Sequence, residues 1–294
     1  MKVGIKLVRR ISLIIVLAIV FTPVNSTQGW GFKAHMRINS DAVDTLPPGM
    51  KNFFESERNF ISEHAVDPDK WKRDDKTEMP RHYIDMDMYG TYPFKELPRD
   101  YEEAVKKFGA EVVNARGTLP WRIVEYTNKL AEDMKSGNRE KIRMTAAALG
   151  HYVGDSHSPL HAAENYNGQY TNNYGVHKQF ENRMVNANID SYEPELKEAT
   201  SIEEPLTNAF DIVLNSYKLV LPILEAETKA RKILTDEQID SLNDWSAKEI
   251  PEYLAILYSD LGEIGWKQMN SASYNLGRYW VTAWELAGKP VLPE

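Results

Sequence analysis

Two pairs of side chains in this sequence have a spacing suited to binding one metal ion on a helix. His151 and Asp155 are four residues apart, and so are His177 and Glu181. On a helix this separation puts both members of a pair on one face, one turn apart. Imidazole and carboxylate are ordinary zinc ligands. Each pair can therefore hold a cation, and the chemistry to expect is that of a metal-dependent hydrolase.

Helices must position these pairs. Met144 to Leu149 is a run of good helix formers, and Pro159 ends that helix just before His161. The helical period predominates from Trp30 onward, and few runs alternate with period two. We therefore predict an all-α fold, a single bundle domain over residues 30–294 whose inward-facing polar side chains converge on metal. The expected helices are Lys33 to Leu46, Met50 to His64, Tyr101 to Phe108, Pro120 to Lys135, Arg139 to His157, Val176 to Val185, Pro205 to Leu224, Asp236 to Leu261 and Glu263 to Ala287.

Residues 1–29 are typical of a signal peptide. Four basic residues precede a short apolar run from Ile11 to Phe21, which is shorter than the roughly 20 residues of a comfortable membrane span. We expect export to the periplasm or the medium, with an uncleaved anchor as the alternative. The chain of 294 residues has no cysteine, so no disulfide forms and stability must come from the core and the metals.

Loss of the signal peptide makes the protein more acidic. It removes four basic residues and no acid, so the net charge goes from −8 to about −12. Tight non-specific binding to duplex nucleic acid is thereby disfavoured, because that binding depends on cationic side chains. The acidic charge does not exclude a nuclease whose bound metals supply the positive charge.

Further histidines and one acid complete a longer pattern that resembles the superfamily of zinc-dependent phospholipases C and single-strand-specific nucleases. Asp67 lies in Ala65-Val-Asp-Pro-Asp-Lys-Trp71, and His82 lies in Arg81-His-Tyr-Ile-Asp85. The nine matching positions are, in order, Trp30, His35, Asp67, His82, His151, Asp155, His161, His177 and Glu181.

The resemblance implies three zinc ions. The first would be bound by Asp67, His82, His151 and Asp155, the second by Trp30, His35 and the shared Asp155, and the third by His161, His177 and Glu181. Trp30 would contribute its amine and carbonyl oxygen, so it becomes a ligand only when cleavage after Gly29 frees that amine. His64 and His157 have no place in the pattern, and a surface or structural role is expected for both.

Such a site is suited to phosphodiester hydrolysis, in which zinc-bound hydroxide attacks phosphorus. Asp155 holds the metals, and Asp67 and Asp85 are candidate acid/base or water-orienting groups. A non-catalytic exported protein stabilised by zinc is the alternative from another class. It is disfavoured because the pattern has more ligands than a structural site needs.

The ligand pattern does not distinguish lipid from nucleic-acid substrates. The acidic charge, the missing disulfides and the segment Arg81 to Gly90 favour the bacterial phospholipase C-like branch, with transient contact at a membrane surface. The alternative is a single-strand nuclease or 3'-nucleotidase. No protein partner is predicted. Candidate substrate-binding residues are Lys33 and, in the loop between two ligand-bearing segments, Tyr166, Asn167, Tyr170 and Tyr174.

Overall fold

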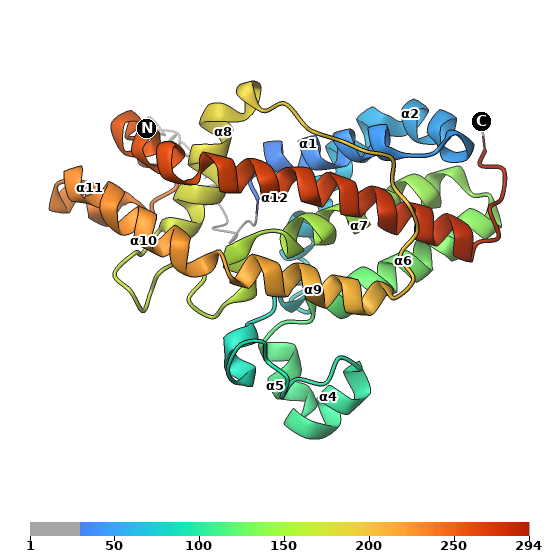
Figure 1. The fold of residues 1–294 in the computed structure, drawn as a ribbon, viewed down its shortest axis with the longest axis horizontal. Coiled ribbons are helices and arrows are strands. Elements are labelled where there is room, and N and C mark those ends of the chain that lie inside the picture. Colours follow the sequence, from blue (N-terminus) through green and yellow to red (C-terminus); the bar gives the residue numbers. More distant parts are fainter. Residues whose placement is uncertain (1–29, 294) are drawn as a thin grey trace, which may run out of the picture.

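The computed structural model describes residues 30–293, and within that range it contains helices and loops but no strand (Figure 1). The predicted all-α fold is confirmed. The α-helices are α1 (Phe32–Ala42), α2 (Pro48–Glu63), α3 (Asp67–Trp71), α4 (Tyr101–Phe108), α5 (Ala110–Ala115), α6 (Leu119–Ser136), α7 (Arg139–Ser156), α8 (Val185–Asn188), α9 (Pro205–Tyr217), α10 (Val220–Ala230), α11 (Asp236–Ser241) and α12 (Pro251–Leu286). Shorter helical segments are η1 (Val43–Thr45), η2 (His64–Val66), η3 (Met79–His82), η4 (Met86–Tyr89), η5 (Pro159–Ala162), η6 (Lys178–Met184), η7 (Ile189–Ser191) and η8 (Arg231–Ile233).

The 36-residue helix α12 runs the length of the bundle and packs on α1, α6, α7 and α10 (Figure 1). Trp280 of α12 is fully buried, and its indole N–H donates to the carbonyl of Ala146 on α7 at 3.2 Å. Its ring also lies 4.7 Å from that of Phe54 on α2. These contacts join three helices around one core, which holds α7 and its ligand pair in the interior of the protein.

A smaller module, from Ile84 to Ala115, projects from the bundle and contains α4 and α5 (Figure 1). It has a hydrophobic cluster of its own, in which Phe94 is almost fully buried, and it packs on α9 through Phe210. Its first residue, Ile84, is two positions after His82, so the module borders the candidate site.

The observed helix boundaries differ from the predicted ones mainly toward the C-terminus. The expected helix from Pro205 to Leu224 is divided into α9 and α10, and the one from Asp236 stops at Ser241. In contrast, the break predicted at Gly262, between the helices expected to end at Leu261 and to begin at Glu263, does not occur. Burial of one face of α12 outweighs the modest loss of helix stability that a glycine causes. Within the described range, no helix is both long enough and apolar enough to cross a membrane.

Candidate metal centre

The first ligand group is built on α7. His151 and Asp155 are one turn apart on this helix, and the Nε2 atom of His151 lies 3.1 Å from Oδ2 of Asp155. Both side chains are fully buried. Because α7 is covered by α1, α2, α6 and α12, its ligand face is turned away from solvent. The spacing of four residues on a helix thus brings His151 and Asp155 together, as predicted.

His82 and Asp69 complete this group. The Nδ1 atom of His82 lies 2.9 Å from both Nε2 of His151 and Oδ2 of Asp155. Oδ1 of Asp69 lies 3.8 Å from Nδ1 of His82 and 3.7 Å from Nε2 of His151. Ligand atoms about 2.0 to 2.1 Å from a central zinc in a tetrahedron are roughly 3.3 Å apart, so the atoms of His82, His151 and Asp155 have separations close to those of one zinc shell, and Asp69 lies slightly farther out.

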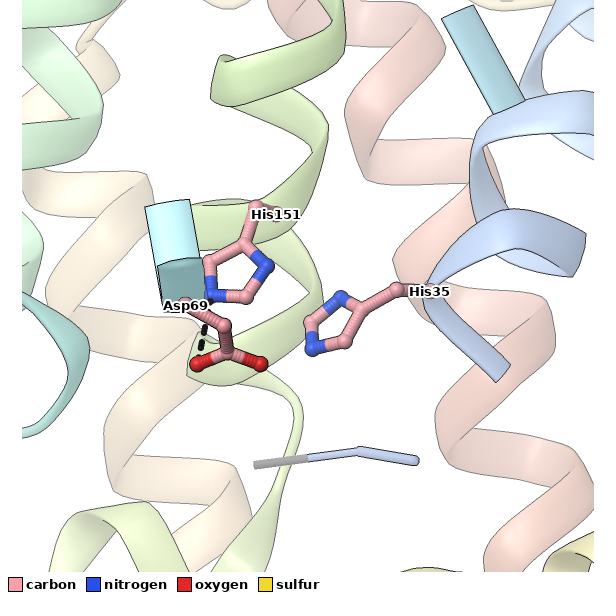
Figure 2. A group of neighbouring side chains, drawn as sticks. All are labelled: His35, Asp69 and His151. Atoms are coloured by element: carbon pink, nitrogen blue, oxygen red, sulfur yellow. Dashed lines mark ion pairs between the residues drawn. The ribbon is translucent and has the colours of Figure 1, made fainter. Parts of the chain in front are cut away.

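His35 reaches the same region from α1. Figure 2 shows His35, Asp69 and His151 turned toward one another from three different helices. The Nε2 atom of His35 is 3.4 Å from Oδ1 of Asp155, so the two oxygens of Asp155 face different histidines. A carboxylate in this position can bridge two cations, as the sequence predicted for Asp155.

The third ligand group stands slightly apart. It consists of His161, His177 and Glu181. The Nε2 atoms of the two histidines are 3.3 Å apart. The Oε2 atom of Glu181 lies 2.8 Å from Nε2 of His177 and 3.6 Å from Nε2 of His161. The predicted set is brought together in full.

Several donor atoms in these groups are buried without a hydrogen-bond partner. They include both ring nitrogens of His35 and Oδ2 of Asp69. Buried polar atoms are costly unless they are paired or coordinate a metal. The donor set therefore fits cations, and nitrogen with carboxylate oxygen is a combination typical of zinc.

The structure brings Asp69, rather than the predicted Asp67, to the ligand cluster. Asp67 lies on the other side of α3, where its Oδ2 is 2.5 Å from Nδ1 of His64 and its Oδ1 accepts from Lys70 at 2.8 Å. Asp69 is almost fully buried. Burial raises its pKa, but His151, Lys72 and His82 outweigh that effect and hold the pKa below its ordinary value.

The ligand histidines are oriented by hydrogen bonds at their other ring nitrogens. Nδ1 of His151 lies 2.9 Å from the carbonyl oxygen of Ala65. Nδ1 of His161 lies 2.5 Å from the backbone carbonyl oxygen of His82. Donation from these nitrogens leaves each Nε2 free to face a metal. Beyond His82, the carboxylate of Glu78 lies 3.4 Å from Nε2 and accepts from the hydroxyl of Tyr152.

The N-terminal end of the described chain is bound to the third group. His177 immediately precedes η6, a π-helix, and Glu181 lies in the middle of it. The carbonyl of Glu181 accepts the amide N–H of Gly31 at 3.1 Å, and the indole of Trp30 packs on Phe180. The amine predicted as a ligand exists only after cleavage, and the predicted signal peptide lies outside the described residues. The position of Trp30 as a ligand stays a prediction.

A cavity of about 450 Å³ opens beside the ligand groups, and His82, His161 and His177 line it. Asp85 also faces this cavity. Burial, together with the nearby Asp87 charge, raises the pKa of Asp85 to about 7. A carboxyl group that titrates near neutral pH is suited to acid/base work.

Lys72 is a cavity-lining residue that sequence reasoning missed. Its side chain is only 3% exposed, and its ammonium group lies 2.5 Å from Oδ1 of Asp69. The signal was present in the sequence, because Lys72 follows Asp69 at the helical spacing of three. It places a positive charge at the edge of the metal cluster.

Of the predicted substrate-binding residues, Tyr166 and Tyr170 line the cavity. Asn167 and Tyr174 instead make hydrogen bonds with Asn243. Lys33 is exposed on α1 and is not among the cavity-lining residues. The predicted loop therefore reaches the cavity with two of its tyrosines.

The two leftover histidines have separate surroundings. His64 contacts Asp67, as described above, and stacks on Phe60. His157 is buried between α7 and α12, with Nδ1 2.8 Å from the carbonyl of Val153 and Nε2 3.1 Å from the side-chain nitrogen of Asn275. Burial lowers the pKa of His157 to about 4, which fits a neutral ring that accepts from Asn275.

The fold is similar to that of solved bacterial toxin structures. The crystal structure of alpha-toxin from the Clostridium perfringens avian strain SWCP is 12% identical, with a TM-score of 0.51 over 90% of this chain and 65% of that one. This chain thus spans just under two thirds of the toxin chain. Alpha toxin from Clostridium absonum is 13% identical, with a TM-score of 0.49 over 87% of this chain and 64% of that chain. Among curated proteins no sequence match was found.

The family comparison covers most of the chain. A model of the S1/P1 nuclease family matches residues 30–278, which include every candidate ligand. The family resemblance predicted from the sequence is therefore confirmed as far as the S1/P1 nuclease family. This protein belongs to the S1/P1 nuclease family.

Proposed function

We propose that this protein is an exported, zinc-dependent phosphodiesterase in which hydroxide is the nucleophile. The observation that carries the proposal is the placement of buried donors from two groups, His82 of the first and His161 with His177 of the third, at the wall of one cavity. Asp155 belongs to the first two groups, and its Oδ1 lies 3.6 Å from the His161 ring of the third. A phosphate in the cavity would therefore lie next to the first and third groups, and Asp155 connects these to His35 of the second.

The residues that would hold zinc are those whose donor atoms face one another. They are His35, Asp69, His82, His151, Asp155, His161, His177 and Glu181. When bound, zinc makes a coordinated water acidic enough to ionise near neutral pH and neutralises charge on phosphate oxygens. The second group would be completed by the Trp30 amine after cleavage, which rests on the family resemblance.

Two further side chains of this chain contribute to the chemistry. Asp85 faces the cavity with a pKa near 7, so it can accept or donate a proton at neutral pH. Lys72 presents a buried ammonium group to the cavity, where it favours an anionic phosphoester.

We infer that the substrate is single-stranded nucleic acid or a nucleotide. Tyr83, Tyr166 and Tyr170 line the cavity beside the ligand groups. Aromatic side chains of this kind stack on nucleobases at about 1–3 kcal/mol per base. The family model also supports the nucleotide over the lipid that the sequence favoured.

A phospholipid is the second candidate, because the acidic net charge of the chain opposes binding of a polyanion. Parallel assays decide between the two. Zinc-loaded protein is incubated with single-stranded DNA, a 3'-mononucleotide and phosphatidylcholine vesicles, before and after chelation. Cleavage of DNA alone supports the proposal. Release of the lipid head group alone refutes the inference that the substrate is nucleic acid or a nucleotide. No turnover of any of the three would favour the alternative of a non-catalytic, zinc-stabilised protein.

Export is proposed on the character of residues 1–29. Expression of the full chain in a bacterium, followed by N-terminal sequencing of the periplasmic fraction, tests it. A mature chain that begins at Trp30 supports both export and the amine ligand. A full-length chain in the cytoplasm would overturn both.

A further inference from the structure

A buried cluster of polar side chains lies beneath the loop that leads from His161 to His177. At its centre is the carboxylate of Glu227 on α10, which is fully buried. Arg231 donates to both of its oxygens at 2.6 to 2.9 Å, and the hydroxyl of Tyr253 donates to Oε1 at 2.9 Å. A buried charge needs such partners to be tolerated. None of these residues contributes to the ligand groups.

The loop is fastened to this cluster through Asn173. The side-chain nitrogen of Asn173 donates to Oε2 of Glu227 at 2.5 Å, to the carbonyl of Leu224 at 3.1 Å and to the hydroxyl of Thr228 at 2.8 Å. Arg231 also donates to the carbonyl of Asn172. Asn173 is 1% exposed, so the loop inserts one side chain into the protein at this point.

The same loop carries side chains into the cavity. Tyr166, Gln169 and Tyr170 line it, and they precede Asn173 by only three to seven residues. Gly168 lies between them with φ +70°, and a Cβ there would be 2.4 Å from that of Asn173. The packing of Gly168 against Asn173 therefore joins the cavity-lining half of the loop to the buried half.

We propose that Glu227 and Asn173 are positioning residues that set substrate affinity by holding this loop, residues 164–175, at the cavity. The inference rests on the proposed function, because it assigns Tyr166 and Tyr170 to substrate binding. Loss of the anchor releases the tyrosines while the zinc ligands keep their places. The expected signature is a change in KM with little change in kcat.

The test compares Glu227→Gln and Asn173→Ala with Glu225→Gln, which removes an exposed carboxylate from the same helix. In the zinc-loaded protein from which residues 1–29 have been removed, we expect both anchor variants to raise KM for a single-stranded oligonucleotide about tenfold and to change kcat by less than about twofold. Zinc content should match that of wild type. Unchanged KM, or a fall in kcat with loss of zinc, would overturn the proposal.

Limited digestion with chymotrypsin is a readout that does not depend on activity. The loop contains Tyr166, Tyr170 and Tyr174 as cleavage sites. If the loop is held by the anchor, Asn173→Ala should be cut there about ten times faster than wild type, since cleavage needs local opening. Equal rates would refute the anchor even if the protein proves to have another substrate. An accelerated cut in a protein without nuclease activity would refute the proposed function alone.

Discussion

Exchanging Asp69 and Asp67 for asparagine, one at a time, tests the ligand assignment most directly. Asp69 has its Oδ1 within 3.8 Å of two ligand histidines and is buried. Changes in residues that only support a ligand already cost 10–100-fold in metal affinity. We therefore expect Asp69→Asn to weaken zinc binding at least about 100-fold, which equals about 2.7 kcal/mol.

The same change also affects the metal-free protein. Lys72 loses the carboxylate that lies 2.5 Å away, and breaking a buried ion pair costs up to about 3–5 kcal/mol. Asp67→Asn is the matched control two residues away. It removes an ion pair with Lys70, whose side chain is 46% exposed, so its cost in folding is about 0–1 kcal/mol with zinc binding unchanged.

The assay is elemental analysis of each variant after dialysis against zinc buffered by a competing chelator. Circular dichroism first confirms that both variants are folded. Asp69→Asn should retain less zinc than wild type, and Asp67→Asn should retain as much. Zinc lost from Asp67→Asn and kept by Asp69→Asn would refute the assignment and restore the ligand predicted from the sequence.

Three further outcomes are expected. Asp155→Asn should lose zinc from two groups and nearly all turnover, whereas His157→Ala should keep its zinc and lose only about 1–3 kcal/mol of stability, as elemental analysis and thermal unfolding will show. Gly31→Ala places a Cβ 2.8 Å from a side chain of η6 and should lower zinc content, while Gly265→Ala, whose Cβ would meet no atom closer than 3.7 Å, should not. Asp85 has a pKa raised from 3.8 to about 7, so its contribution to stability is complete below about pH 4 and is lost as pH rises to 7. Asp85→Asn should therefore melt higher than wild type at pH 8 and yet be about 100-fold less active, and a lower melting temperature would contradict the raised pKa.

Ligands on one helix could be predicted because a helix fixes their relative positions. His151 with Asp155, and His177 with Glu181, meet as their spacing of four residues requires. His35 and His82 could be assigned only through the family resemblance, since nothing local in the sequence relates them to α7. The anchor at Glu227 escaped prediction for the same reason, because its partner Asn173 is 54 residues away along the chain.

The segment from His64 to Trp71 contains two aspartates, Asp67 and Asp69, that the sequence alone makes equally good candidates for a metal ligand. Asp67 and Asp69 are two positions apart on α3, and side chains two apart on a helix point to nearly opposite faces. Only one of them can face the ligand histidines, and the sequence of so short a helix does not set which. The choice is made by tertiary contacts, because the ring of His151 binds the carbonyl of Ala65 just before α3. That contact fixes the rotation of the helix, which turns Asp69 inward and leaves Asp67 to pair with Lys70 at the surface.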